Sequence, residues 1–188
     1  MALDSPKRAR IYPETLCAGS VAAAELLQPR IEPEVVLGAD LAQGAAVDAI
    51  ATAVEWDAAG LEVVQCHFDG WEMTPAEAVA EAGLHAALAI GPRREVDAAA
   101  VHGLAAARCD LLCDAVLVAT GRGTDVLGGP LDGLHWLVRG LPGGLRAGEI
   151  VTTGTLTQAL PVEPGQRWQH RLTATIALDP LVRRGPRS

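Results

Sequence analysis

The sequence contains few aromatic residues, few cysteines and no long apolar run. Phe, Trp and Tyr make up 3% of the 188 residues, so Ala, Val and Leu must fill most of the core. Four cysteines with no CxxC pair are too few and too scattered for a disulfide framework, and we expect Cys109 and Cys113 to be buried thiols. No apolar stretch approaches the roughly 20 residues that span a bilayer, and the charged N-terminus is unlike a signal peptide. These absences argue against a membrane partner and predict a cytoplasmic protein.

Basic residues are also in deficit. Against 23 Asp and Glu there are 15 Lys and Arg, which gives a formal net charge of −8. Nucleic-acid binding needs clustered Lys and Arg that displace counterions from phosphates. Basic residues gather only at positions 7–10 and 183–187, and we interpret both clusters as solvated termini. A nucleic-acid partner is therefore not expected.

The chain length and composition are typical of one globular domain between two short terminal segments. Residues 1–10 are polar and have no periodic pattern, so we expect a mobile N-terminal arm. Residues 179–188 form a basic C-terminal tail. Between them no repeat period and no long Pro-, Gly- or Ser-rich linker is visible, so residues 11–178 are expected to form a single domain.

The first half of the domain predicts a strand, a helix and a second strand. Residues 31–38 form a strand pattern, but Pro33 cannot donate to a sheet ladder, which favours an edge position or a bulge. Apolar residues recur at helical spacing across 45–59, and Gly60 would end that helix. The β-rich run 61–68 then predicts a strand.

The second half continues with short elements of both kinds. Residues 74–77 (TPAE) are typical of a capping box, and the alanine-rich stretch 96–107 favours helix. The remaining patterns predict strands at 84–90, 109–119, 149–155 and 167–176, and helices from the capping box to Gly83 and from Pro130 to Gly140. Mixed strands with a few short helices indicate an α+β, β-rich fold.

Three glutamates are candidates for a metal site. Glu32 and Glu34 are two apart on an expected strand, so their side chains share one face about 7 Å apart. Glu62 lies in an apolar run, where an ionised carboxylate is costly unless it is paired. Converging carboxylates are neutralised best by a hard divalent ion, which predicts Mg²⁺ or Mn²⁺. The alternative is that Glu32 and Glu34 are exposed on an edge strand and Glu62 caps a helix end.

Several segments resemble, in order and spacing, the 2-keto-4-pentenoate hydratase and 4-oxalocrotonate decarboxylase branch of the fumarylacetoacetate hydrolase superfamily. The resemblance extends over roughly residues 10–176 and implies the mixed β-sheet roll of that superfamily's C-terminal domain. The segments that carry it are 28–34 (QPRIEPE), 61–64 (LEVV), 128–131 (GGPL) with 136–137 (WL), 146–157 (RAGEIVTTGTLT) and 161–165 (PVEPG).

This resemblance implies roles for particular residues. In the family the ExE pair and the later glutamate bind Mg²⁺ or Mn²⁺, which chelates a 2-oxo acid, and the roles fall on the three glutamates above. The turn Thr153-Gly154-Thr155 lies beside the substrate in such enzymes, so Thr153 and Thr155 are candidate substrate-binding residues. Trp71 is a further candidate substrate-binding residue that would stack on the substrate, and the alternative is a place in the core or the pocket wall. A homo-oligomer, or a complex with a related enzyme, is also implied.

The sequence departs from the family where protons are transferred. The family's N-terminal lysine has no counterpart, and His67 and Glu81-Ala82 stand where the family has Arg and an Asp-Asn pair. His67 and Glu81 are therefore candidate catalytic residues, since imidazole exchanges protons near neutral pH. The alternative for His67 is a structural histidine on a strand. The other four histidines show no ligand spacing and receive no role.

These observations leave more than one function open. The first is a divalent-metal-dependent lyase or hydratase-like enzyme that acts on a small 2-oxo or 2-hydroxy-dienoic acid through a metal-stabilised enolate. The second is a non-catalytic partner subunit of a full-length homologue. The third is a tailoring isomerase or cyclase of secondary metabolism that uses the same fold.

Overall fold

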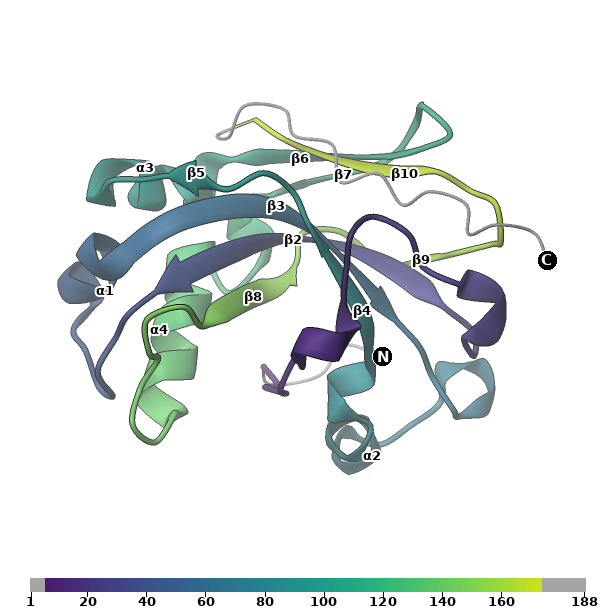
Figure 1. Cartoon of the computed structure of the whole chain (residues 1–188), viewed down its shortest axis with the longest axis horizontal. Coiled ribbons are helices and arrows are strands. Elements are labelled where there is room, and N and C mark those ends of the chain that lie inside the picture. Colours follow the sequence, from purple (N-terminus) through teal and green to yellow (C-terminus); the bar gives the residue numbers. More distant parts are fainter. Residues whose placement is uncertain (1–5, 174–188) are drawn as a thin grey trace.

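The computed structural model describes residues 6–173, except for the side chain of Val47, and within this range the chain folds around two β-sheets. The larger sheet has the strand order β1-β4-β3-β2-β8, with β5 paired to β3 and β9 paired to β2, and the smaller has the order β10-β6-β7 (Figure 1). The strands of the larger sheet are β1 (Leu16–Cys17), β2 (Arg30–Ala39), β3 (Val54–Val64), β4 (His85–Ile90), β5 (Arg94–Glu95), β8 (Ile150–Thr155) and β9 (Leu160–Pro161). The strands of the smaller sheet are β6 (Arg108–Cys113), β7 (Val116–Arg122) and β10 (Trp168–Leu172).

The pairing is mixed, as expected. β1 and β4 run parallel, whereas every other named pair is antiparallel. The α-helices of the described chain are short: α1 (Val47–Ala53), α2 (Pro75–Ala80), α3 (Ala98–Gly103) and α4 (Pro130–Gly140). None of these helices is long and apolar enough to cross a membrane.

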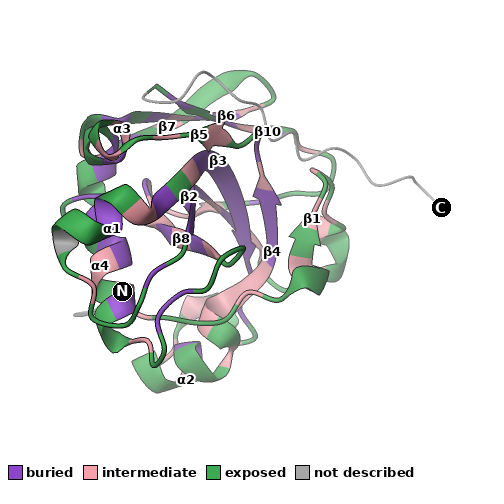
Figure 2. Cartoon of the chain, turned by 60° about the vertical axis from the view of Figure 1, so that its left-hand side comes forward, coloured by how far each residue is buried: buried purple, intermediate pink, exposed green. Residues whose placement is uncertain are grey.

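The core lies between the large sheet, the small sheet and the helices. Val35 and Leu37 of β2 are buried in one cluster with Ile50 of α1 and with Leu134 and Val138 of α4. A second cluster joins the two sheets and includes Ile31, Leu61, Leu111 and Trp168. Figure 2 shows β2 and β3 as almost continuously buried ribbons in the middle of the molecule. Apolar burial of this kind is the main favourable contribution to folding.

The other face of the large sheet carries a smaller cluster. Val36, Ala58 and Leu88 are buried there, and Ile11 from the N-terminal segment packs against them. Successive side chains of a strand point to opposite faces, so Val36 shares its face with Glu32 and Glu34. β2 therefore carries a core on one face and the candidate acidic residues on the other.

Pro33 does not lie in an edge strand, which was one of its two expected positions. β2 lies between β3 on one side and β8 and β9 on the other, so it is not an edge strand. Pro33 falls at an irregularity instead: β9 pairs with the start of β2, β8 pairs from Glu34 onward, and the register shifts before Val36. The Pro33 carbonyl accepts the N–H of Leu156, so the missing donor faces the gap between β8 and β9.

The helix expected over 45–59 is too long. Only Val47–Ala53 is helical, and Val54 already begins β3. Gly60, expected to end the helix, lies inside β3, where an added Cβ would lie 2.6 Å from Val36 Cγ2. β3 is bordered by β2 and by β4 and β5, and these sheet hydrogen bonds override the helical spacing of its alanines.

The strand expected over 109–119 is a hairpin. β6 ends at Cys113 and β7 begins at Val116, and between them Asp114 and Ala115 have φ of 48° and 67°. Two residues with positive φ form the tight turn that suits the twist of antiparallel strands. The alternation is correct, but the direction reverses within it. Cys109 is buried and Cys113 is half-buried.

Other expectations are confirmed. Thr74 and Glu77 form both hydrogen bonds of the capping box that starts α2, and the expected helix from Pro130 to Gly140 is α4. The expected strand 84–90 is β4, and the C-terminal strands are β8 and β10. The tail at 179–188 lies outside the described residues, as do part of the N-terminal arm and the end of the strand expected at 167–176.

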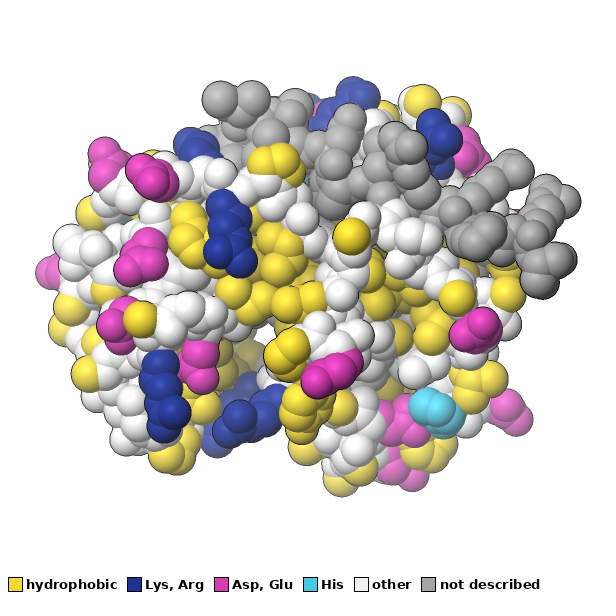
Figure 3. Space-filling model, viewed as in Figure 1, with side chains coloured by type: hydrophobic (Ala, Val, Ile, Leu, Met, Phe, Trp, Pro, Cys, Tyr) yellow, Lys and Arg dark blue, Asp and Glu magenta, His cyan; other side chains and the backbone are white. Residues whose placement is uncertain are grey.

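Charged side chains are dispersed on the face drawn in Figure 3. Among the described residues of this face, Lys and Arg side chains alternate with acidic and apolar ones and form no continuous basic surface. A pocket of about 680 Å³ lies along α4, and Arg8, His135, Trp136 and Arg139 contribute to its lining. Its lining includes none of the three glutamates.

Candidate metal centre

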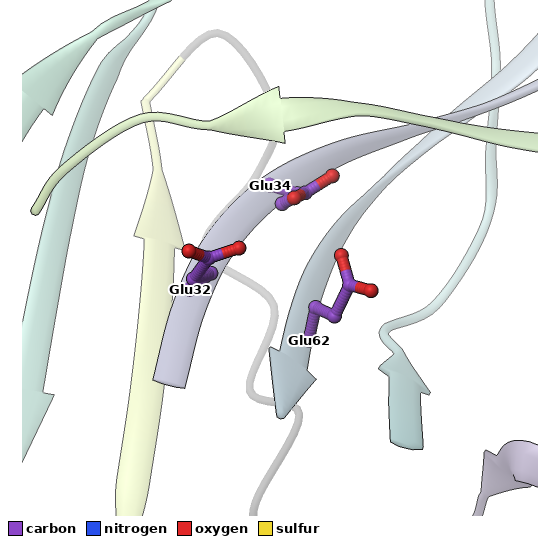
Figure 4. Close-up of side chains that lie close together, drawn as sticks. All are labelled: Glu32, Glu34 and Glu62. Atoms are coloured by element: carbon purple, nitrogen blue, oxygen red, sulfur yellow. The ribbon is translucent and has the colours of Figure 1, made fainter. Parts of the chain in front are cut away.

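The three glutamates of the sequence pattern converge on one face of the large sheet. Glu32 lies directly opposite Glu62 in the β2–β3 pair, and Glu34 lies opposite Gly60. One carboxylate oxygen of each residue lies within 4.8 Å of the other two. Figure 4 shows the three side chains on the same side of the two ribbons, with the carboxylates close together. Gly60 has no side chain, so nothing from β3 occupies the place opposite Glu34.

Glu34 and Glu62 are buried, and Glu32 is half-buried. Burial raises the pKa of Glu34 well above its usual range, and the Glu62 carboxyl adds to the rise. Burial, and next the Glu34 carboxylate, raise the pKa of Glu32 to about 8, while Arg30 opposes the rise. Burial and the Glu32 carboxylate raise the pKa of Glu62 to about 7, against the effect of a hydrogen bond with Glu34. Without a counter-charge, the cluster holds protons near neutral pH.

Hydrogen-bond donors fix two of the carboxyls. The backbone N–H of Gly154 donates to Glu34 Oε2 over 3.0 Å. The side chain of Thr152 also hydrogen bonds to Glu34, and both contacts favour the ionised form. His85 Nδ1 lies 2.6 Å from Glu62 Oε1. Burial lowers the pKa of His85, and the charge of Glu34 opposes this.

The donor set fits a hard divalent cation. No Lys or Arg of the described chain forms an ion pair with any of the three glutamates, whereas converging carboxylate oxygens are the ligands that Mg²⁺ and Mn²⁺ prefer. The alternative in which Glu32 and Glu34 are exposed on an edge strand and Glu62 caps a helix does not match the structure, because Glu34 and Glu62 are buried inside neighbouring strands.

The two candidate substrate-binding threonines, Thr153 and Thr155, have different positions relative to Glu34. Thr155 lies opposite Glu34 in the β2–β8 register, and its hydroxyl donates to the carbonyl of Thr157. Thr153 is buried, its hydroxyl donates to the Val35 carbonyl, and its Cβ would lie 3.7 Å from a Cβ added to Gly133 of α4. Thr153 therefore faces α4.

Trp71, the third substrate-binding candidate, belongs to the 3-10 helix Asp69–Trp71. Its indole N–H donates to the Gln28 carbonyl over 3.1 Å, and the Arg30 guanidinium lies 4.4 Å from its ring centroid. Arg30, Glu32 and Glu34 alternate onto one face of β2. Trp71 therefore holds in place the cationic side chain nearest in sequence to the carboxyl cluster.

The two candidate catalytic residues contact each other. His67 Nδ1 lies 2.7 Å from Glu81 Oε2, and the side chains are 54% and 19% exposed, respectively. His67 follows β3, and Glu81 lies just beyond the end of α2. The structure thus brings together the two residues that the sequence offered as catalytic candidates.

Two residues at the site were missed by the sequence reasoning, Thr152 and His85. Thr152 is adjacent to the residues of the TGT turn, and the period of two would have assigned it to the same face as Val36 if the β2–β8 register had been known. His85 has no spacing relation to the glutamates and reaches Glu62 only through the pairing of β4 with β3. Neither signal can be read from one sequence.

The chain is similar to known proteins over most of its length. A family model described as Fumarylacetoacetate (FAA) hydrolase C-terminal matches residues 17–178. A 2-hydroxyhexa-2,4-dienoate hydratase of Comamonas testosteroni is 31% identical over 160 residues, which are 80% of this chain and 59% of that protein. A 2-keto-4-pentenoate hydratase of Paraburkholderia phymatum is 34% identical over 152 residues, 74% of this chain and 55% of that protein. The chain thus spans less than two thirds of the length of these relatives.

Solved structures share the fold. A 4-oxalocrotonate decarboxylase from Pseudomonas putida G7, complexed with magnesium and adipate, superposes with a TM-score of 0.80 at 22% identity and covers 91% of this chain and 66% of that chain. A fumarylpyruvate hydrolase from Pseudomonas aeruginosa, in complex with Mn²⁺ and pyruvate, gives 0.69 at 20% identity and covers 87% of this chain and 69% of that chain. The expected mixed β-sheet roll is confirmed.

Proposed function

The chain belongs to the fumarylacetoacetate hydrolase C-terminal family, and we propose that it is a divalent-metal-dependent enzyme of the lyase or hydratase type. Its substrate is a small 2-oxo acid, a 2-hydroxy-dienoic acid or another enolisable carbonyl compound, and its cation is Mg²⁺ or Mn²⁺. The observation that carries the proposal is the convergence of three carboxyls within 4.8 Å in a buried site. It is supported by relatives named hydratases and by neighbours complexed with magnesium or Mn²⁺.

Glu32, Glu34 and Glu62 would hold the cation. When bound, it supplies fixed positive charge that offsets the negative charge developing on the 2-oxo oxygen of the substrate as a proton or CO₂ departs. The chain prepares the site in advance: the Gly154 N–H fixes Glu34, which the sheet buries. Such preorganisation avoids reorientation of solvent during the reaction.

Proton transfer is assigned to the pair of His67 and Glu81. An imidazole that contacts a carboxylate is held in one orientation and can pass a proton to or from a substrate. More than half of the His67 side chain is exposed, so it can exchange protons with solvent. Thr153, Thr155 and Trp71 remain the candidates for substrate binding.

A second candidate function is a partner subunit without catalysis of its own. It is favoured by the carboxyl cluster together with His67 and Glu81, which stand where the resemblance implies other residues in the hydratases. A homo-oligomer or a complex with a related enzyme stays a prediction for either function, as does a cytoplasmic location.

The experiment that tests the proposal is proton exchange in deuterated water. Purified chain with Mn²⁺ or Mg²⁺ is incubated with 2-oxopentanoate, and exchange at C3 is followed by proton NMR. The enzyme proposal predicts cation-dependent exchange that Glu34→Gln abolishes. Exchange no faster than in buffer with the cation alone contradicts it and favours the partner subunit.

A further inference from the structure

His85 lies between a metal-site glutamate and the N-terminal segment. It is the first residue of β4, and its side chain is 4% exposed. Nδ1 lies 2.6 Å from Glu62 Oε1, and Nε2 lies 2.7 Å from the hydroxyl of Thr15. Thr15 ends the 3-10 helix Pro13–Thr15, in which its hydroxyl also lies 2.8 Å from the Tyr12 carbonyl. Three segments that are distant in sequence thus meet at one imidazole.

The hydrogen bonds determine which nitrogen of the His85 ring carries the hydrogen. An ionised carboxylate can only accept, so the contact with Glu62 requires the hydrogen on Nδ1 of His85. Nε2 then faces the Thr15 hydroxyl, which can donate or accept. With both nitrogens engaged and the ring buried, the imidazole has one orientation, and so has the carboxylate that it binds.

This contact engages one oxygen of Glu62. Oε1 lies against His85 Nδ1, so a cation bound through both oxygens would compete with this contact. Glu34 is restricted in the same way, because its Oε2 accepts the Gly154 N–H. In both carboxylates one oxygen is therefore already hydrogen bonded, and the Thr152 side chain also hydrogen bonds to Glu34. Ca²⁺ takes six to eight oxygens and commonly binds carboxylates through both, whereas Mg²⁺ requires a compact octahedron.

We propose that His85 is a positioning residue of the metal site: it holds Glu62 so that one oxygen faces the cation, and Thr15 holds His85. The consequence is a preference for Mg²⁺ and Mn²⁺ over Ca²⁺. Hydrogen bonds behind metal ligands commonly contribute tenfold to 100-fold in affinity. The inference rests on the proposed metal-dependent function and assigns a role to a histidine that does not itself touch the ion.

The test compares three substitutions of one residue. In His85→Asn the amide nitrogen lies near the place of Nδ1 and can still donate to Glu62. In His85→Gln it lies near the place of Nε2, and in His85→Ala both donors are absent. His102→Ala, at an exposed position of α3, is the matched control. Dissociation constants for Mn²⁺, from the EPR signal of the free ion, and for Ca²⁺, from competition, are measured with the melting temperature of each cation-free protein.

The expected result is ordered. Mn²⁺ affinity falls about tenfold or more in His85→Ala and His85→Gln, stays within about threefold in His85→Asn, and is unchanged in the control. Ca²⁺ affinity falls less, so the ratio of the Ca²⁺ dissociation constant to the Mn²⁺ dissociation constant becomes smaller. A general loss of stability would not change this ratio. Thr15→Val weakens Mn²⁺ binding by a smaller factor.

Two outcomes overturn the inference separately from its premise. If the wild-type chain binds Mn²⁺ and His85→Ala binds it equally well, His85 has no positioning role while the metal site stands. If His85→Ala does not fold, equal Mn²⁺ affinity of His85→Asn and His85→Gln would also show that His85 has no positioning role. If the wild-type chain itself binds no Mn²⁺, the proposed function and this inference fall together.

Discussion

Glu32 and Glu62 lie directly opposite each other in the antiparallel pair of β2 and β3. Like charges at opposed positions destabilise a sheet, and burial makes the repulsion stronger. The pKa of Glu32 rises to about 8 and that of Glu62 to about 7, so the cation-free fold relieves the repulsion by binding protons. The arrangement costs stability in a way that a bound cation would reverse.

The first prediction concerns pH. Because these carboxyls have a higher pKa in the folded chain than the value of 4.5 without the fold, the folded state binds more protons above that pH. The free energy of unfolding of cation-free protein should therefore fall as pH rises from about 4.5 through about 8, and Mg²⁺ or Mn²⁺ should offset the fall. Urea denaturation at several pH values, with and without Mg²⁺, measures this.

The double variant Glu32→Gln/Glu62→Gln is the control, since it lacks both titrating groups. Its difference from wild type isolates the two carboxyls from other acids of the chain. Parallel pH profiles of the two proteins would contradict the assignment of a strained carboxyl pair.

The second prediction concerns a buried ion pair on the face of β3 that is opposite to the face of Glu62. Asp57 is fully buried, and Arg94 binds it through two nitrogens at 3.2 and 2.7 Å. Removing Arg94 leaves the fully buried Asp57 carboxylate without its counter-charge, so Arg94→Ala should cost about 3 kcal/mol or more of unfolding free energy. Asp110→Ala removes the more exposed pair with Arg108 and should cost under about 1 kcal/mol. Equal losses in chemical denaturation would show that Asp57 needs no partner.

The third prediction separates proton transfer from cation binding. His67→Ala should lower turnover about 100-fold, the range of general acid and base catalysis, and leave Mn²⁺ affinity unchanged. Glu81→Gln keeps the shape but weakens the contact to His67, so a smaller loss is expected. His135→Ala on α4 is the control. Unchanged kcat in His67→Ala would make His67 a structural histidine.

The fourth prediction tests how the two sheets meet. A Cβ added to Gly121 of β7 would lie 1.8 Å from the carbonyl oxygen of Leu156, a residue that also binds Pro33. Gly121→Ala should therefore destabilise the fold by about 2 kcal/mol, because the backbone must shift. At Gly103 of α3 an added Cβ has open space, and Gly103→Ala should stabilise by about 0.5 kcal/mol or more. A neutral Gly121→Ala in thermal unfolding would refute the close approach.

The family and the acidic cluster can both be predicted from the sequence, but on separate grounds. The period of two places Glu32 and Glu34 on one face of β2 whatever the strand pairs with, so this part follows from the chain alone. That Glu62 lies opposite Glu32 depends on the register of β2 and β3, which no local pattern specifies. The resemblance of the five segments supplied it, and the family match over residues 17–178 confirms the resemblance.

The errors have the same origin. The alanines of 54–59 have high helix propensity, but β2 and β5 on either side give this stretch more hydrogen bonds and burial as a strand. Pro33 was compatible with an edge, and only the gap between β8 and β9 shows how an inner strand tolerates it. His85 reaches Glu62 from the neighbouring strand β4, a relation set by tertiary pairing.

Titration of the purified, cation-free chain with Mn²⁺ tests the central claim most directly, with free Mn²⁺ followed by EPR in wild type and in Glu34→Gln. Glutamine has the shape of glutamate without its charge, so the fold should be kept. The three-carboxylate site predicts saturation at one Mn²⁺ per chain, competition by Mg²⁺, and loss of binding in the variant. Absence of saturable binding by the wild type, or equal binding by Glu34→Gln, would contradict it.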